Sequence, residues 1–477
     1  MSRDDRSALY AFSTALLARM PFADAATTAL PLPRLLRLGL FQVTVGMANA
    51  LLVGALNRVM IVELGMAASI VSLAVALPML LAPLRAAMGF ASDTHRSAFG
   101  WRRVPYIWKG TMWQFFGYAL MPFAMLAITG QGAMDMVSFG WAVLLLAFVM
   151  VGIGTNLTQT AGLALATDLA TEETRPRVVA LLWVMLLVGM VIGALGFGVA
   201  LRDYSPTKLV QVVQGVGLLT LALNIVAVWR QEARDPARAA TPPATQSFFA
   251  AWEEYRREPR AVRLLVVVGL GALGFNMQDV LLEPYGGQVL GLSVAGTTVL
   301  TAISASGALL AFGVAARWLR GLMDPARVAA AGVLTGLLAF CAVILASPLA
   351  SPALFRLGAL GIGFGGGLFS VGTLTLAMQQ ARTERAGLAL GAWGAVQASC
   401  AGVGALVGGA VRDVMTSAHL LHGGAGPSPA ASGYVAVYVL ELVFLFVALA
   451  VLGPLATPLG ARRAVVAEPF GLADLPG

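Results

Sequence analysis

The sequence predicts an all-α membrane protein with twelve transmembrane helices, arranged as two pseudo-symmetric six-helix halves with both termini in the cytoplasm. Three observations predict it: the composition, the length of the apolar runs and the distribution of basic residues. Of 477 residues, 58% are hydrophobic and only 11% are charged, whereas soluble domains carry about 25% charged residues. The chain therefore matches the composition of a protein that crosses the membrane many times.

A helix that spans the bilayer needs about 20 mostly apolar residues. Twelve runs of the chain meet this requirement: 36–62, 69–90, 104–128, 138–166, 178–201, 209–229, 262–285, 293–316, 326–347, 353–378, 387–411 and 434–453. The longest hydrophilic interruption, Trp229 to Arg263, divides them into two sets of six. We therefore expect five units: a cytoplasmic N-terminal segment with an interfacial helix (1–35), the N-terminal half (36–229), a cytoplasmic linker (230–261), the C-terminal half (262–453) and a cytoplasmic tail (454–477).

Lysine and arginine collect on the cytoplasmic side of membrane proteins. With the N-terminus inside, only five of the 31 basic residues fall on the outer side: Arg58, Arg202, Lys208, Arg356 and Arg412. This asymmetry also explains the net charge of +8 without a nucleic-acid partner.

The two halves resemble each other. Three residues of the first half recur 210 positions later: Gly162, Arg175 and Trp183 match Gly372, Arg385 and Trp393. A second echo is ELGMAAS at 63–69 against VLGLSVA at 289–295. Two six-helix halves joined by a cytoplasmic linker form the plan of the major facilitator fold.

The predicted loop after the second run reads GFASDTHRSAFGWRR. It resembles the cytoplasmic gate motif of major facilitators, in which Gly-x-x-x-Asp precedes basic residues, although three extra residues separate its Asp from its Gly-Arg pair. The matching residues are Gly89, Asp93, Arg96, Gly100, Arg102 and Arg103. The Asp can cap a helix or pair with arginines and so tie neighbouring helices together. The alternative is an ordinary basic cytoplasmic loop.

Longer segments are more specific than the fold. They are LPLPRLLRLGLFQVTVGMANALLVGALNRVMIVELG, SDTHRSAFGWRRVPYIWKGT and QDVLLEPYGGQVLGL. Together they closely resemble the PucC/LhaA family, the bacteriochlorophyll-delivery branch of the major facilitators, over about Leu16 to Leu455. The resemblance implies an assembly factor for a bacterial light-harvesting complex. The long N-terminal and central segments favour the LhaA type, which serves the core antenna, over the PucC type, which serves the peripheral antenna.

The resemblance also implies cargo, partners and location. The cargo is bacteriochlorophyll, bound transiently, with lipids around it. The partners are the antenna α and β polypeptides and the core antenna–reaction centre complex, with chlorophyll synthase as a further candidate. The location is the bacterial cytoplasmic membrane, in its intracytoplasmic photosynthetic part, and the protein crosses it many times.

Polar residues cluster at one end of the seventh run. Asp279 and Glu283 are four residues apart and share one helix face. Ionisable groups inside a membrane are costly and point to function. The candidate binding residues are Asn276, Gln278, Asp279 and Glu283, with Asn57 and Arg58 at the matching end of the first run. Two interpretations stay open: a wall of the pigment or partner site, or a polar latch between the halves in which Arg58 pairs with a carboxylate. Pro284, Gly286 and Gly287 are expected to end the helix.

The chain has three histidines, His95, His419 and His422, and none lies in a predicted span. A magnesium ligand must therefore be an oxygen donor, a histidine at the membrane edge or water, and magnesium accepts oxygen readily.

Aromatic residues crowd the third run, and we expect Tyr106, Trp108, Trp113 and Phe116 to dock the antenna partner. Interfacial anchoring is the alternative role for such residues. Eight other polar residues in the runs are expected to bond across helices: Gln42, Asn49, Gln114, Asn156, Gln159, Asn224, Gln397 and Glu441.

No motif for catalysis or nucleotide binding is present, so the chain is expected not to be an enzyme. Cys341 and Cys400 are expected to be small buried apolar residues, and no metal centre is predicted. Two alternatives to an assembly factor that carries pigment stay open. One is a proton- or ion-coupled transporter of a small solute, although 41–54 lacks a carboxylate for proton coupling. The other is a membrane scaffold for antenna polypeptides that binds no pigment.

Overall fold

The computed structural model describes residues 25–27, 30–81, 101, 103–128, 137–171, 174–232, 258–320, 323–380, 386–422 and 429–456. Within these ranges the chain is helical and contains no β-strand. Eleven helical segments in the described part are long and apolar enough to cross a membrane. The fold is therefore an all-helical membrane bundle, as predicted.

The N-terminal half begins with a first span that changes helix type several times, followed by regular helices. Its elements are α2 (Leu32–Leu38), α3 (Leu40–Asn49), η2 (Ala50–Ala55), α4 (Leu56–Arg58), η3 (Val59–Glu63), α5 (Ala68–Leu80), α7 (Val104–Ile128), α8 (Val137–Leu169), α9 (Arg175–Ala200) and α10 (Pro206–Val228).

The C-terminal half repeats this pattern. Its elements are α12 (Pro259–Asn276), η6 (Met277–Val280), α13 (Leu282–Gln288), α14 (Val294–Arg320), α15 (Pro325–Ala346), α16 (Pro352–Gln380), α17 (Ala386–His422), α18 (Pro429–Leu452) and η8 (Gly453–Leu455).

Most predicted runs agree with the observed spans to within a few residues, but α17 continues to His422, whereas the predicted run ends at 411. The first span covers Leu32–Glu63 and the seventh covers Pro259–Gln288. The predicted run 69–90 corresponds to α5, whose described part has 13 residues. Most of the predicted linker, the predicted tail beyond 456 and the N-terminal segment before 25 lie outside the described residues.

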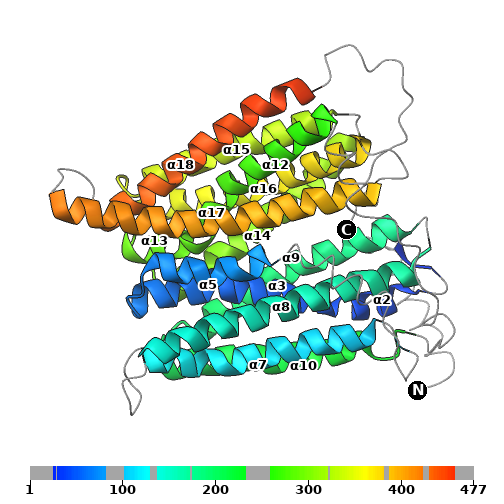
Figure 1. The fold of residues 1–477 in the computed structure, drawn as a ribbon, viewed down its shortest axis with the longest axis horizontal. Coiled ribbons are helices and arrows are strands. Elements are labelled where there is room, and N and C mark those ends of the chain that lie inside the picture. The colour runs from blue at the N-terminus through cyan, green and yellow to red at the C-terminus, as the bar shows by residue number, and fades with distance from the viewer. Residues whose placement is uncertain are drawn as a thin grey trace, which may run out of the picture.

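The halves lie side by side. In Figure 1 the helices of the first half, α2 to α10, occupy one side of the bundle, and those of the second half, α12 to α18, occupy the other. The halves meet along two interfaces, α5 against α17 and α9 against α14. These pairs are the second with the eleventh and the fifth with the eighth predicted spans, so a pseudo-twofold axis exchanges them. α2 and the C-terminal end of α18 lie at the same end of the bundle (Figure 1).

Two glycines report the internal repeat directly. Gly65 follows the first span and Gly291 follows the seventh, and both adopt a φ of 65°. Glycine has no Cβ and occupies this left-handed region without strain. The ELG and VLG echoes therefore mark the same turn in the two halves.

Helix starts follow local chemistry. The Ser205 hydroxyl accepts a hydrogen bond from the Lys208 N–H at the start of α10, and Asp324 accepts one from the Ala326 N–H at the start of α15. Proline follows each capping residue, where its missing N–H is not needed. Both cysteines are free, but Cys341 is exposed on α15, not buried as predicted. It shares an outward face with Leu334, Leu338 and Leu345.

Candidate functional site at the junction of the first and seventh spans

The first and seventh spans both lose regular α-helical geometry near the same end of the bundle. The first span is π-helical over Ala50–Ala55 and again over Val59–Glu63. The seventh tightens to a 3₁₀ turn over Met277–Val280. Such irregular turns displace backbone groups from their usual partners and often mark functional sites. At this junction the displaced groups bond to side chains instead.

Asn57 links the two breaks. It is fully buried, and its side-chain amide donates hydrogen bonds to the Val53 carbonyl of its own span and to the Asp279 carbonyl of the seventh span, the latter at 3.1 Å. The asparagine therefore satisfies a carbonyl on each side of the boundary between the halves.

Glu441 of α18 satisfies the other displaced group. Its Oε1 accepts the Gln278 backbone N–H at 2.6 Å, and the glutamate is fully buried. The Gln278 side-chain amide donates to Asp279 Oδ1 at 2.6 Å, whereas the Asn276 amide donates to the Ala272 carbonyl of its own helix. The expectation that Glu441 bonds across helices is confirmed. The sequence did not indicate that this residue lies beside the site; the fold brings it there.

Glu283 points toward the first span. Its Oε1 accepts a hydrogen bond from the Thr301 hydroxyl of α14 at 2.5 Å, and the residue is 2% exposed. A Cβ on Gly54 would lie 2.6 Å from Thr301 Oγ1 and 2.7 Å from the same Glu283 oxygen, so glycine leaves room for this hydrogen-bonded pair as it stands. Glu283 Oε2 is buried and has no hydrogen-bond partner among the described residues. The site thus holds a carboxylate with unused acceptor capacity.

Arg58 pairs with Glu63 of its own span, not with Asp279 or Glu283. Its Nη2 also reaches the Leu292 carbonyl at 3.4 Å. The guanidinium lies over Gly287, where a Cβ would come within 3.2 Å of Nε. An Arg58 pair with either carboxylate, one form of the predicted latch, is therefore not formed. Arg58 and Glu63 are five residues apart, and the π-helix at Val59–Glu63 brings their side chains to the same face.

The predicted helix end is also corrected. α13 continues through Pro284, Gly286 and Gly287 and ends at Gln288. The break lies upstream, in the 3₁₀ turn at Met277–Val280, where tertiary contacts replace the regular hydrogen bonds.

A second connection joins the halves at the same end. Asp413 of α17 accepts the Ser69 N–H at 2.7 Å and the Ala68 N–H at 3.3 Å. These N–H groups lie at the start of α5, whose own N-cap residue, Ala67, supplies no side-chain hydrogen bond. A residue of one half therefore caps a helix of the other, while Arg412 pairs with Asp413 at 2.8 Å.

Of the predicted gate motif, only Arg103 lies within the described residues; Gly89, Asp93, Arg96, Gly100 and Arg102 lie outside them. Arg103 Nε pairs with Asp168 of α8 at 3.1 Å. Glu232, just after α10, accepts the backbone N–H groups of Arg103 and Val104. Arg103 therefore ties α7 to α8, and its backbone binds the chain beyond α10.

Three of the four predicted docking residues of α7 face outward. Trp108 and Trp113 are each 43% exposed and Phe116 is 53% exposed. Tyr106 is half-buried, and the Lys109 ammonium lies 5.2 Å from its ring centre. The outward orientation fits both a docking face and a lipid-facing helix.

Most of the other predicted polar contacts across helices are present. Gln159 donates to Gln42, Gln114 to Thr158, Asn224 to Thr111 and Asn156 to the Pro78 carbonyl. The side chains of Asn49 and Gln397 make no hydrogen bond to any described residue and are the exceptions within that part of the chain.

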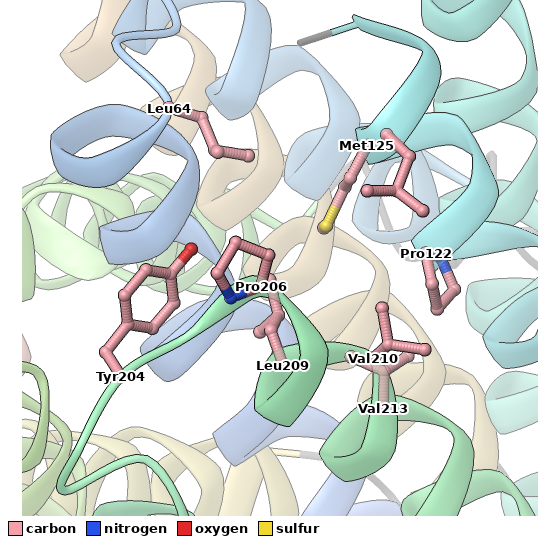
Figure 2. Close-up of a pocket in the computed structure, with 9 residues that line it drawn as sticks. Leu64, Pro122, Met125, Tyr204, Pro206, Leu209, Val210 and Val213 are labelled. Atoms are coloured by element: carbon pink, nitrogen blue, oxygen red, sulfur yellow. The ribbon is translucent and has the colours of Figure 1, made fainter. Parts of the chain in front are cut away.

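Two cavities lie outside the junction. Figure 2 shows one of about 30 Å³ between α7 and α10, with Leu64, Met125 and Tyr204 among its lining side chains. It is mostly apolar and water-sized. Burial, and then the nearby Glu63 charge, raise the pKa of Tyr204, so its hydroxyl stays neutral. The other cavity, of about 120 Å³, lies between α3, η2, α5, α8 and α17.

The junction is closed in this conformation. Asn57, Arg58, Gln278 and Glu283 are each at most 5% exposed. Its carboxylate oxygens suit magnesium chemically. Glu283 is buried, and a pigment macrocycle cannot reach it without separation of the spans, whereas Asp279 is partly exposed. His419 and His422 follow the last residue of the eleventh span, Ala418. The described residues contain no cluster of three metal-ligating side chains.

Known proteins resemble the chain in both sequence and fold. A solved bacterial homolog of the human lysosomal transporter Spinster, inward-facing and unoccupied, superposes with a TM-score of 0.65 at 16% identity, covering 88% of this chain and 95% of that one. This likeness confirms the major facilitator fold.

An uncharacterized protein from the puhA–bchM intergenic region of Rhodobacter capsulatus is 51% identical over 96% of this chain and 97% of its own length. Protein PucC of Rhodovulum sulfidophilum is 51% identical over 87% of this chain and 92% of its own. The profile of the family described as PUCC protein matches residues 55–459. The chain therefore belongs to the PucC protein family.

Proposed function

We propose that this protein is an assembly factor for a bacterial light-harvesting complex, and that it binds bacteriochlorophyll and delivers it to nascent antenna polypeptides within the membrane. Membership in the PucC family carries the proposal, because this family of purple bacteria is linked to the photosynthetic antenna. The protein acts as a carrier and not as an enzyme. The client is the core antenna, which the long N-terminal and central segments support.

The junction of the first and seventh spans is the latch of this carrier. Asn57 and Asp413 supply bonds between the halves at the same end of the bundle. Closure at one end leaves the α5–α17 and α9–α14 interfaces as lateral routes for an insoluble pigment. With both termini in the cytoplasm, the latch lies on the outer side of the intracytoplasmic membrane.

Asp279 and Glu283 serve the cargo when the latch opens. Each is a hard oxygen donor, and the unused oxygen of Glu283 is available to a ligand or to bound water. Bacteriochlorophyll brings the light-absorbing macrocycle and its magnesium; the protein provides oxygen donors, an apolar surround and exclusion of water. A weak oxygen donor suits a carrier that must release its cargo.

A transporter of a small solute is the second candidate, because the fold neighbour is a transporter. A pigment-free scaffold for antenna polypeptides is the third. A strain that lacks the protein tests all three. We expect its core-antenna absorbance to fall while antenna transcripts persist, and the wild-type gene to restore it. Normal antenna together with lost uptake of a solute would favour the transporter. Restoration of the antenna by a variant that binds no pigment would favour the scaffold.

A further inference from the structure

We propose that the 120 Å³ cavity in the N-terminal half is a binding pocket for a neutral, carbonyl-bearing group of a large apolar ligand. The proposal rests on the proposed function in taking that ligand to be the bacteriochlorophyll cargo. The pocket is separate from the carboxylates of the junction, and it recognises the substituents at the edge of the macrocycle, not its magnesium.

Four helical elements and one residue of the other half form the walls. α3 and η2 contribute Asn49 and Leu52, α5 contributes Pro78, and α8 contributes Thr155 and other residues. Asn156 and Gln159 of α8 and Ala398 of α17 also line the cavity. Because α3 and η2 belong to the same span, three spans of one half meet a helix of the other half around the cavity.

Several polar groups at the pocket lack partners. The side chain of Asn49 is partly exposed and makes no hydrogen bond to any described residue. The Thr155 hydroxyl is buried without a hydrogen-bond partner in the described part of the chain, and the residue is 8% exposed. Gln159 donates to Gln42 at 3.3 Å, but its own carbonyl oxygen accepts no hydrogen bond from the described residues. Leaving a buried polar group unpaired is unfavourable, so the Thr155 hydroxyl favours a polar occupant. The Asn49 side chain and the Gln159 carbonyl line the same pocket and can bind that occupant as well.

Asn156 has a different role. Its side-chain amide donates to the Pro78 carbonyl at 3.3 Å and so fixes the wall where proline interrupts α5. We therefore assign recognition of the ligand to Asn49, Thr155 and Gln159, and shaping of the pocket to Asn156.

The chemistry of the lining selects the ligand class. No lining residue carries a charge, so a carboxylate, phosphate or ammonium would be buried without a counter-ion, at high cost. The Asn49 amide and Thr155 hydroxyl can both donate to a carbonyl oxygen. The volume corresponds to about four water molecules at roughly 30 Å³ each, enough for a ketone, acetyl or ester group but not for a whole macrocycle.

The C-terminal half shows that the fold does not require this pocket. The 210-residue offset places Gly365, Gly366 and Phe369 at the positions of Thr155, Asn156 and Gln159. There the rings of Phe369 and Phe275 pack with centroids 5.7 Å apart, and Phe275 lies against Gly366. Aromatic rings fill the space in one half, whereas unpaired polar groups line it in the other.

The pocket also lies on a route for access. Ala398 completes its wall from α17, and Gly402 of α17 packs against Met79 and Leu80 at the same interface with α5. Separation of α5 from α17 would open the pocket sideways to the bilayer. The rest of a bulky ligand could then remain between the halves while one substituent occupies the pocket.

A matched pair of threonines tests the proposal. Thr155 and Thr220 both have buried, unbonded hydroxyls, but only Thr155 lines the pocket. The full chain, purified in mild detergent, is titrated with bacteriochlorophyll and with magnesium-free bacteriopheophytin, which keeps the carbonyl groups. The variants are Thr155→Val, Asn49→Leu with Thr155→Val, and the control Thr220→Val. Resonance Raman spectra report the carbonyl stretching frequencies of the bound macrocycle, which hydrogen bonding lowers.

We expect the double variant to bind both macrocycles at least about tenfold more weakly, because two hydrogen bonds are lost. Its residual bound pigment should show a higher carbonyl stretching frequency, while Thr220→Val should match the wild type. Unchanged affinity and unchanged frequencies in the double variant would overturn the pocket and leave the carrier function standing. A wild type that binds neither macrocycle would overturn both.

Lipid esters offer the same carbonyl chemistry. Retention of an ester-linked phospholipid is therefore compared with retention of its ether-linked counterpart, which lacks the carbonyls, by native mass spectrometry. A preference for the ester that the double variant loses, together with unchanged pigment binding, would assign the pocket to lipid and overturn the pigment as its ligand. Equal retention of both lipids in every variant, with weakened pigment binding, would support the pigment.

Discussion

The side-chain amide of Asn57 donates a hydrogen bond to the Asp279 carbonyl at 3.1 Å, and so joins the irregular turn of the first span to that of the seventh. The contact crosses the boundary between the halves at a buried position. Because one side chain serves carbonyls of two spans, the stability of this end of the bundle depends on it.

Replacing Asn57 with alanine should therefore destabilise the protein more than replacing Asn276. Both amides bond to a carbonyl four residues earlier, but only the Asn57 amide also reaches the other half. Single hydrogen bonds between membrane helices contribute about 0.6 kcal/mol on average and up to about 1.7 kcal/mol. We expect the free energy of unfolding to fall by about 1–2 kcal/mol for Asn57→Ala and by about 0.5 kcal/mol for Asn276→Ala. Thermal unfolding in mild detergent measures both; equal losses would argue against the latch.

Gly54→Ala should disturb the Glu283 carboxylate. The new Cβ would lie 2.6 Å from Thr301 Oγ1 and 2.7 Å from Glu283 Oε1, so the hydrogen-bonded pair must shift. Overpacking of this kind costs about 1–3 kcal/mol. Gly196→Ala is the control, because a Cβ there meets no atom within 4 Å. Unfolding in detergent should show a loss for Gly54→Ala alone, and an equal effect of the two changes would mean that the close approach at Gly54 is not maintained.

The carboxylates can be tested apart from stability. Asp279→Asn and Glu283→Gln keep shape and remove charge, and among the described residues Asp279 has no ion-pair partner that its loss would strand. We expect the double variant to reach normal abundance in the membrane but to support less antenna. Immunodetection and core-antenna absorbance, measured on the same cells, separate the two effects. Normal abundance with normal antenna would remove the carboxylates from the mechanism.

The outward aromatic residues of α7 form the predicted docking face. Replacing Trp113 and Phe116 with leucine should reduce co-purification of antenna polypeptides several-fold, while the same change at Phe446, which is 67% exposed on α18, should not. Quantitative mass spectrometry of the purified complexes provides the measurement. Equal recovery from both variants would indicate that these aromatic residues face lipid.

The sequence predicted the spans through the length of its apolar runs and the position of its basic loops, because both depend on the bilayer alone. It also placed Asn57 and Arg58 opposite Gln278 to Glu283, since the pseudo-twofold relates the first and seventh spans. It missed Glu63 as the partner of Arg58. Side chains five residues apart lie on the same face of a π-helix but not of an α-helix, and the π-helix is imposed here by packing. The bond from Gln278 to Glu441 joins residues 163 positions apart and could not be read from local pattern.

The absorption spectrum of the protein, purified in mild detergent from phototrophically grown cells, tests the central claim most directly. The account predicts bacteriochlorophyll bands that co-purify with the protein, persist through size exclusion and diminish on addition of unpigmented antenna polypeptides. A colourless protein that retains antenna polypeptides, or one that instead accumulates a polar solute in proteoliposomes, would contradict it.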